Sequence, residues 1–406
     1  MNNRLTLALA ALITAIASAA QVLPGVEVLA ARGFAPVKGK RVALVTNPTG
    51  VDRRLRSTVD ILHSAPGVSL VALLAPEHGV RGNITAGARV ATETDAATGV
   101  KVHSLYGRTR KPTAEMLRDA DVLVYDIQDL GCRSYTFIST LGLCMEACAE
   151  QGKEMVVLDR PNPLGGERVE GAMLDSDCRS FVSQYNIPYL YGLTPGELAL
   201  YLNDSEFGGR VRLTVVPMEG WKRRMTYADT GLPWVLPSPH VPTPQTAMFY
   251  PATGILGELD YASVGVGYTM PFRLICTAWA DADELARRLN ALKLASVTFR
   301  PVHIKPYYGF GNGQDLHGVE VYINDPHTPV DLTLLQFYAM QELAAMRPAK
   351  AAFSQPAASS SRLQMFDRVC GSKKIRQEFS RRHLVADILP LWQSDFREQS
   401  RPYRLY

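Results

Sequence analysis

The chain has 406 residues, of which 47% are hydrophobic and 20% are charged, a composition typical of a globular protein large enough for two domains. The 43 Lys and Arg residues and the 39 Asp and Glu residues leave a net charge of +4. Because this excess is small and no basic cluster is interleaved with aromatic residues, nucleic acid is disfavoured as a partner.

The first twenty residues have the features of a secretory signal peptide. MNNR places one basic residue before the apolar run LTLALAALITAIA, and the small residues ASAA at 17–20 offer a cleavage site. The apolar run is shorter than the roughly 20 residues that a membrane-spanning helix needs, and no later segment reaches that length. We therefore expect residues 1–20 to be a signal peptide of a secreted, periplasmic protein without a membrane span.

Strand-like apolar runs alternate with helical segments in the first two thirds of the chain. The runs lie at 41–47, 69–75, 100–106, 121–127 and 154–159. Most are continuously apolar, as strands buried on both faces are, and helical segments such as RSTVDILHSA separate them. This pattern predicts a Rossmann-like α/β domain with a parallel sheet, spanning residues 25–265.

The pattern changes in the last third of the chain. Strand candidates at 273–280, 297–304 and 318–324 are separated by helical stretches at 281–292 and 331–346. We therefore expect a second, smaller α+β domain at 270–406.

Polar residues follow the ends of all five predicted strands, where open parallel sheets bind their ligands. In strand order they are Asn47 and Thr49; Glu77, His78 and Arg81; Tyr106 and Arg108; Asp126, Gln128, Asp129 and Arg133; and Asp159, Arg160 and Asn162. Each has a structural alternative, since Asp159 and Asn162 could cap loop backbone and Arg133 could pair with Asp129. Together they favour a polar catalytic cleft.

The sequence motifs of several other kinds of active site are absent from this chain. A dinucleotide site would need G-x-G-x-x-G after the first strand, where TNPTGVDRR has a single glycine. No P-loop or G-x-S-x-G elbow occurs, and neither the histidines nor the six cysteines have metal-ligand spacing. We therefore expect no cofactor and no metal. Carboxylates with Arg, Asn, Gln and Tyr side chains suit a sugar substrate.

Several ordered motifs resemble those of the NamZ family of exo-acting β-N-acetylmuramidases. They are APEHGVRG, YDIQDLGCRSYTF, DRPNPLGG followed by VEGAMLD, PSPHVPT, SVGVGYTMPF and MFDRVCGSKKIR, which together span nearly the whole mature chain. The resemblance implies a Rossmann-like catalytic domain, a smaller C-terminal domain and a pocket at their interface. It also implies removal of N-acetylmuramic acid from the non-reducing end of peptidoglycan fragments, without a cofactor.

Carried onto this chain, the resemblance makes Glu77 the leading catalytic carboxylate and Glu170 the second, with Asp126 and Asp159 as rivals for the second place. The expected substrate-binding residues are Asn47, His78, Arg81, Asp126, Gln128, Arg133, Tyr135, Asp159, Arg160, Asn162, His240 and Tyr268. The chain departs from the family pattern at His240, where Asn is usual, and at Tyr268, where a Thr-type residue is common.

A muramyl residue carries a lactyl carboxylate, which a planar guanidinium can bind with two hydrogen bonds. Arg81, Arg133 and Arg160 are the candidates for this contact. Two alternatives remain: an exported protein that binds sugars without reacting, and a hydrolase of another bond such as an amide of the stem peptide. The four acidic candidates favour an enzyme, and the absence of a Ser, Cys or zinc motif argues against the amide hydrolase.

Overall fold

The computed structural model describes residues 21–77, 79–82, 93–107, 109–353 and 359–406. The predicted signal peptide, His78 and Arg108 lie outside these residues. No helix in the described part of the chain is long and apolar enough to cross a membrane.

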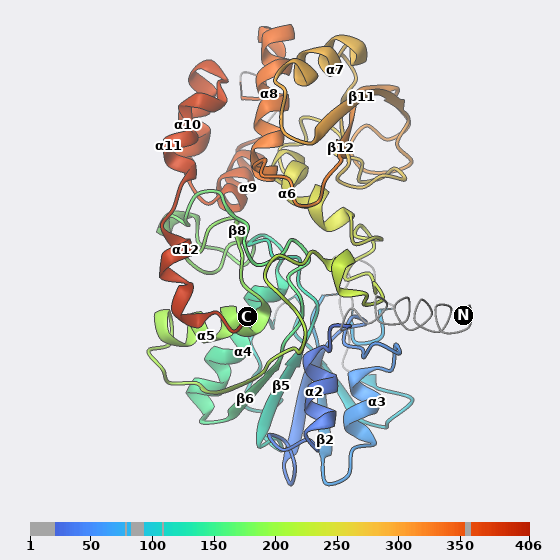
Figure 1. The fold of residues 1–406 in the computed structure, drawn as a ribbon, viewed down its shortest axis with the longest axis vertical. Coiled ribbons are helices and arrows are strands. Elements are labelled where there is room, and N and C mark those ends of the chain that lie inside the picture. Colours follow the sequence, from blue (N-terminus) through green and yellow to red (C-terminus); the bar gives the residue numbers. More distant parts are fainter. Residues whose placement is uncertain (1–20, 78, 83–92, 108, 354–358) are drawn as a thin grey trace, which may run out of the picture.

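A seven-stranded sheet forms the frame of the first domain, in the order β3-β4-β2-β1-β5-β6-β9 (Figure 1). Its strands are β1 (Arg41–Thr46), β2 (Ser69–Ala75), β3 (Glu93–Thr94), β4 (Lys101–Ser104), β5 (Val122–Asp126), β6 (Glu154–Leu158) and β9 (Arg212–Val216). All neighbours pair in parallel except β3, which runs antiparallel to β4 at the edge. The predicted parallel sheet is therefore confirmed.

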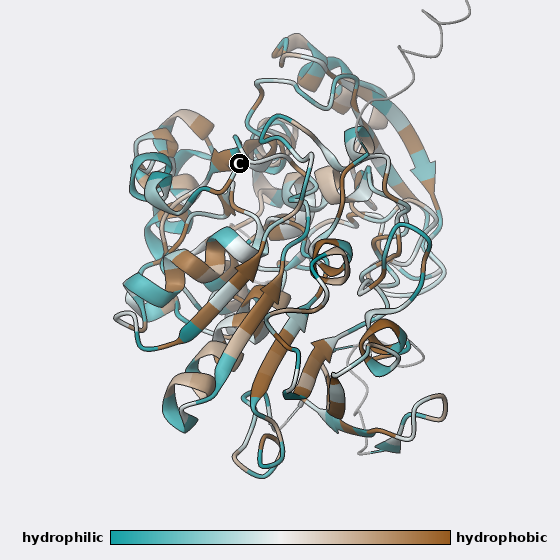
Figure 2. Ribbon diagram, turned by 60° about the horizontal axis from the view of Figure 1, so that its bottom comes forward, coloured by the Kyte–Doolittle hydropathy of each residue, from teal (hydrophilic) through white to brown (hydrophobic). Residues whose placement is uncertain are grey.

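Helices cover both faces of this sheet, which is why its central strands are continuously apolar (Figure 2). On one face α2 (Gly25–Ala31) and α3 (Thr58–His63) share a buried cluster with alternate residues of β1 and β5. On the other face α4 (Phe137–Gln151) and α5 (Pro195–Ser205) pack against the intervening residues. The start of α5 is fixed by a capping box, in which Thr194 and Glu197 exchange side-chain to backbone hydrogen bonds.

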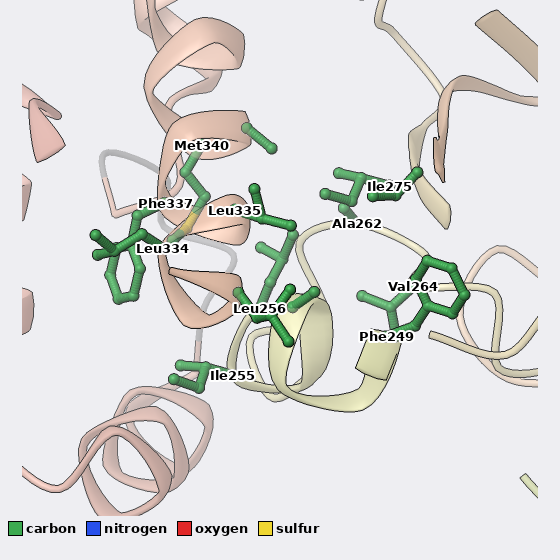
Figure 3. Packing of buried hydrophobic residues seen from close by; sticks show 14 of the residues in the cluster. Phe249, Ile255, Leu256, Ala262, Val264, Ile275, Leu334, Leu335, Phe337 and Met340 are labelled. Carbon is green, nitrogen blue, oxygen red and sulfur yellow. The ribbon is translucent and has the colours of Figure 1, made fainter. Parts of the chain in front are cut away.

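The second domain combines an antiparallel three-stranded sheet with helices, as expected. The sheet has the order β10 (Leu274–Thr277), β12 (Leu316–Ile323), β11 (Val297–Ile304). The helices are α6 (Thr246–Gly257), α7 (Ala282–Ala291), α8 (Leu335–Met346), α9 (Ser360–Cys370) and α10 (Lys373–Arg382). Figure 3 shows their common core, in which Leu256 of α6 lies beside Leu335 and Met340 of α8.

The domain boundary falls before α6 rather than at residue 265. Gln336 of α8 accepts a hydrogen bond from the backbone N–H of Leu256 at 2.9 Å and donates one to the carbonyl of Pro251 at 2.9 Å. Because α6 is apolar on nearly all sides, it belongs to this core and not to the sheet domain.

The end of the chain returns to the first domain. The helices α11 (Leu389–Trp392) and α12 (Phe396–Gln399) run from the second domain towards α5 (Figure 1). Phe396 is buried in the core on the α5 side of the sheet, with its ring 5.1 Å from that of Tyr201. The segment 270–406 is therefore not one separate body.

The remaining elements are short. A two-stranded ribbon consists of β7 (Val169–Glu170) and β8 (Leu190–Tyr191). The 3-10 helices are η1 (Ser176–Cys178), η2 (Tyr227–Thr230), η3 (Leu332–Leu334), η4 (Pro348–Lys350), η5 (Val385–Asp387) and η6 (Arg401–Tyr403). The ribbon lies between the two domains, because Glu170 contacts η3.

Candidate active site

The candidate site begins where the strand order reverses. Strand β1 is central. Strands β2 and β4 lie on one side of it, and the chain then crosses to β5 on the other side. The loops after β1 and β5 meet at this switch point, where open α/β sheets bind ligands. Thr49 joins them, since its hydroxyl donates to Oδ1 of Asn47 at 2.5 Å and accepts from the backbone N–H of Gln128 at 2.8 Å.

Three buried polar atoms at this point have no hydrogen-bond partner among the described residues. They are Nδ2 of Asn47, Oε1 of Gln128 and Oδ1 of Asp129. Leaving such an atom unpaired costs about 1–3 kcal/mol, so a group of three indicates a place for ligand atoms or ordered water. The group offers one donor and two acceptors.

Asp129 is a carboxylate that the predicted site did not single out. Its Oδ2 accepts hydrogen bonds from the backbone N–H of Gly131 at 2.6 Å and from the hydroxyl of Tyr191. Gly131 has a φ of +72°, and a Cβ there would stand 2.3 Å from the side chain of Asn162, so a residue with a side chain would displace this turn. Burial raises the pKa of Asp129 to about 6.

Glu77 lies half-buried two residues after the end of β2, and the charge of Glu77 acts on two tyrosines. Tyr106 follows β4, and burial raises its pKa. The charge of Glu77 and a hydrogen bond between Tyr106 and Glu77 raise this pKa further. Burial raises the pKa of Tyr135 well above its usual value, and the charges of Asp129 and Glu77 add to this rise. Tyr135 is therefore within electrostatic reach of both carboxyl groups.

Edge-to-face contacts fix the ring of Tyr135. Its centroid lies 5.1 Å from that of Phe137 and 5.6 Å from that of Tyr250. Ser238 lies near enough to Tyr135 to offset part of this pKa rise, although the hydroxyl of Tyr135 makes no hydrogen bond of good geometry among the described residues. The PSPHVPT segment containing Ser238 thus lies beside Tyr135.

His240 and Tyr268 lie together with a loop of the second domain. Nε2 of His240 is 2.9 Å from the hydroxyl of Tyr308. The ring of Tyr268 is stacked on that of Tyr307, with centroids 5.6 Å apart. Both predicted substrate-binding residues thus have an aromatic partner that the sequence did not indicate.

Arg133 has a structural role and not the predicted ligand-binding one. It is fully buried, and all five of its guanidinium donors are used. The acceptors are the hydroxyl of Ser183 and the carbonyls of Ala172, Ile187, Val369 and Cys370. Because Val369 and Cys370 belong to α9, Arg133 ties the two domains together and has no donor left for a lactyl carboxylate.

Asp126 and Arg160, both predicted to bind substrate, form a buried ion pair instead. Nε of Arg160 is 2.5 Å from Oδ1 of Asp126, and Nη2 is 2.9 Å from Oδ2. Thr58 donates a further hydrogen bond to Oδ2 at 2.5 Å. Since this carboxylate is already paired with a guanidinium and accepts three hydrogen bonds, its contacts do not support the rival catalytic role given to Asp126.

Asp159 and Asn162 also have structural contacts, as their alternative interpretation allowed. The carboxylate of Asp159 accepts four hydrogen bonds, from the backbone N–H groups of Arg160 and Gly196 and from the hydroxyls of Thr194 and Tyr406. The amide of Asn162 is bonded to Leu164 and Leu193. These residues shape the loops behind the site, and neither the substrate contacts predicted for them nor catalysis by Asp159 is supported.

Glu170 lies at the domain interface. Oε1 accepts a hydrogen bond from Arg168 at 2.7 Å, while Oε2 accepts from the backbone N–H and hydroxyl of Thr333 at 3.0 and 3.1 Å. Among the described residues these partners do not include Glu77, Tyr106 or Tyr135. Its contacts therefore do not support the predicted role as second catalytic carboxylate.

Arg81 is the one member of the three arginine candidates that stands at the surface. Its side chain is 38% exposed, against 5% for that of Arg160, and it is held by ion pairs to Asp95 at 2.9 Å and to Asp60 at 3.1 Å. These two carboxylates orient a guanidinium four residues after Glu77. The neighbouring candidate His78 lies outside the described residues.

No group of three or more His, Cys, Asp or Glu side chains in the described ranges could hold a metal ion. Asp129 was among the polar residues at the predicted strand ends but not among the expected site residues, and its burial and unpaired oxygen are what distinguish it. The exposed Tyr307 and Tyr308 are recognised only from their contacts with His240 and Tyr268.

The comparisons with known proteins agree on one family. Two family models match it: "Exo-beta-N-acetylmuramidase NamZ, N-terminal" at 42–245 and the corresponding C-terminal model at 248–406. The peptidoglycan β-N-acetylmuramidase NamZ of Bacillus subtilis is 47% identical over 305 residues, which are 75% of this chain and 73% of that protein. Two crystal structures of DUF1343 family proteins from Bacteroides fragilis are also similar, and each match covers 95% of this chain and 99% of the other chain. One has a TM-score of 0.90 at 53% sequence identity, and the other has a TM-score of 0.74 at 26% identity.

Proposed function

Because this chain belongs to the NamZ family of exo-β-N-acetylmuramidases, and is thus a glycoside hydrolase, we propose that it releases N-acetylmuramic acid from the non-reducing ends of peptidoglycan fragments. The observation that carries the proposal is that the charges of Glu77 and Asp129 both act on Tyr135, while Asn47, Gln128 and Asp129 each keep an unpaired polar atom at the switch point of the sheet. This arrangement has the two carboxyl groups that glycoside hydrolysis uses.

In this proposal Glu77 is the general acid. It donates its proton to the glycosidic oxygen as the bond between that oxygen and the anomeric carbon breaks. Asp129 is the second carboxylate and assists the addition of water to the anomeric carbon through Oδ1, the oxygen without a protein partner. The amide side chains of Asn47 and Gln128 are assigned to bind the acetamido and hydroxyl groups of the sugar.

Arg81 is proposed to bind the lactyl carboxylate. Asp95 and Asp60 hold its Nε and Nη2, so little side-chain freedom is lost when a ligand binds. Its Nη1, whose one hydrogen bond is a long one of 3.4 Å to Ser57, is left to reach the ligand. Arg133 and Arg160 have no comparable access, because both are buried and committed to protein acceptors.

We also propose that the protein is exported to a periplasm, where peptidoglycan fragments occur. The support for this is the sequence of residues 1–20, with one basic residue, an apolar run and small residues at its end. An antibody against the mature chain should find it in the periplasmic fraction, shorter than the full precursor.

The test of the proposed activity is hydrolysis of a chromogenic β-glycoside of N-acetylmuramic acid beside the matching N-acetylglucosaminide. Rapid release from the muramide alone supports the proposal. Equal rates on both sugars contradict the specificity, and binding of the muramide without turnover favours the alternative of a sugar-binding protein.

A further inference from the structure

Two neighbouring tyrosines of the loop between β11 and β12 are exposed to solvent. Tyr307 is 68% exposed and Tyr308 is 51% exposed. Aromatic rings stabilise a fold when their faces are buried, so two adjacent rings left in water call for another explanation.

Both rings are nevertheless held in fixed positions. The ring of Tyr307 is stacked on that of Tyr268 at an interplanar angle of 26°, and the ring of Tyr308 is stacked on that of His240 at 29°. Tyr308 also shares a hydrogen bond with Nε2 of His240 at 2.9 Å. We call the surface formed by Tyr268, Tyr307, Tyr308 and His240 the tyrosine shelf.

The backbone beneath the shelf is equally constrained. The N–H of Tyr307 donates to the carbonyl of Gly267 at 2.8 Å. Gly267 has a φ of +92°, and a Cβ there would stand 2.0 Å from the carbonyl oxygen of Tyr308, so only glycine allows this approach. An ion pair between Lys305 and Asp315 at 3.1 Å closes the loop. A surface ordered in advance loses little entropy when it binds a ligand.

The shelf continues the wall of the candidate active site. The ring of Tyr135 lies 5.6 Å from that of Tyr250, and the ring of Tyr250 lies 4.9 Å from that of Phe272, four residues after Tyr268. Tyr135 in turn responds to the charge of Glu77. A ligand that extends out of the site past Tyr135 would therefore reach Tyr268 and the two exposed tyrosines.

We propose that the tyrosine shelf binds the sugar that follows the cleaved bond, the glucosaminyl residue at the new end of the glycan. This inference rests on the proposed function, because an enzyme that removes a terminal sugar must hold the rest of the chain outside its pocket. The shelf presents flat apolar faces and polar edges, which fit the C–H face and the hydroxyl groups of a neutral pyranose ring.

The test is the affinity of the protein for the product glycan, a peptidoglycan oligosaccharide with N-acetylglucosamine at its non-reducing end, measured by calorimetry. Tyr307→Ala should weaken binding about tenfold, the equivalent of about 1.4 kcal/mol. Tyr307→Phe, which keeps the ring, should bind like the wild type. Leu389→Ala is the matched control, since Leu389 is another exposed apolar residue, 39% exposed, on α11 at the other side of the second domain (Figure 1).

The same variants give a kinetic readout. For Tyr307→Ala, the ratio of kcat/KM on a muramyl-glucosaminyl disaccharide to kcat/KM on the chromogenic muramide should fall about tenfold relative to the wild type. Unchanged product affinity in Tyr307→Ala, or an equal loss in Tyr307→Phe, would overturn the proposal. Product binding that depends on Tyr307 in a protein without hydrolytic activity would instead leave the shelf standing and refute the proposed function.

Discussion

Tyr191 donates a hydrogen bond to Oδ2 of Asp129, the buried carboxylate whose other oxygen has no partner among the described residues. Burial raises the pKa of Asp129 to about 6, and the bond from Tyr191 opposes this rise. Tyr191→Phe should therefore raise the pKa further. If Asp129 acts in its ionised form, the acidic limb of the pH–rate profile should move to higher pH by about 1 unit.

The matched control for this prediction is Tyr227→Phe, which removes a buried tyrosine hydroxyl bonded to the carbonyl of Pro233. Its pH–rate profile should keep the wild-type acidic limb. An unshifted limb in Tyr191→Phe would remove Asp129 from the mechanism.

Asp129 should also make stability depend on pH. Its folded-state pKa of about 6 lies above the ordinary value of 3.8, so the folded protein holds this proton more tightly than the unfolded chain does. The resulting stabilisation is complete below about pH 4 and is lost as the pH rises through about 6. Asp129→Asn cannot ionise, so between pH 4 and pH 8 its free energy of unfolding relative to the wild type should rise, by about 3 kcal/mol at most.

Urea unfolding of both proteins at several pH values checks this sign. Asp159, whose pKa is also raised to about 6 by burial, is present in both proteins and cancels in the comparison. A difference in stability that stays constant with pH would show that Asp129 ionises normally in the folded state.

Arg133→Met should destabilise the protein without changing its choice of sugar. The replacement leaves five acceptors without their donor, including the carbonyls of Val369 and Cys370 in the second domain. We expect the free energy of unfolding to fall by about 2–5 kcal/mol. Arg287→Met, at a side chain that is 68% exposed, should cost little. A stable Arg133→Met protein that has lost its preference for muramides would restore the ligand role.

Arg81→Met should instead change the choice of sugar without destabilising the protein. Losing a hydrogen-bonded charge contact of about 1.5–3 kcal/mol raises KM for muramides about 10–100-fold, while hydrolysis of glucosaminides is unaffected. Arg56→Met serves as the control, because Arg56 is another surface arginine, 63% exposed, that is paired with an aspartate, Asp52. Measuring KM for both chromogenic sugars decides this, and an unchanged preference in Arg81→Met would refute the assignment.

The sheet could be predicted from the sequence because strands that are buried on both faces are continuously apolar. β2 begins and ends at the residues of the run SLVALLA, and β1 and β5 match their runs within a residue at either end. α6 was assigned to the wrong domain because it is apolar nearly all round, so its pattern does not show which core it enters.

The sequence could locate the site, but it could not assign a role to each acidic residue there. Strand ends placed Asn47, Gln128 and Asp129 at one edge of the sheet, as found. Which carboxylate remains available depends on partners distant in the sequence: Asp126 is neutralised by Arg160, 34 residues later, whereas Asp129, three residues after Asp126, keeps one oxygen unpaired. Such pairings are set by tertiary structure, so a pattern of residue types cannot separate the two acids.

The most direct test of the account is the turnover of Glu77→Gln on a chromogenic muramide. Glutamine keeps the size and most hydrogen bonds of glutamate but cannot donate an acidic proton, so kcat should fall about 10²–10⁴-fold while the unfolding curve and the affinity for a muramyl ligand persist. Glu398→Gln, at a side chain that is 74% exposed, should keep the wild-type rate. A Glu77→Gln protein that hydrolyses the muramide at the wild-type rate would contradict the assignment of Glu77 as the acid.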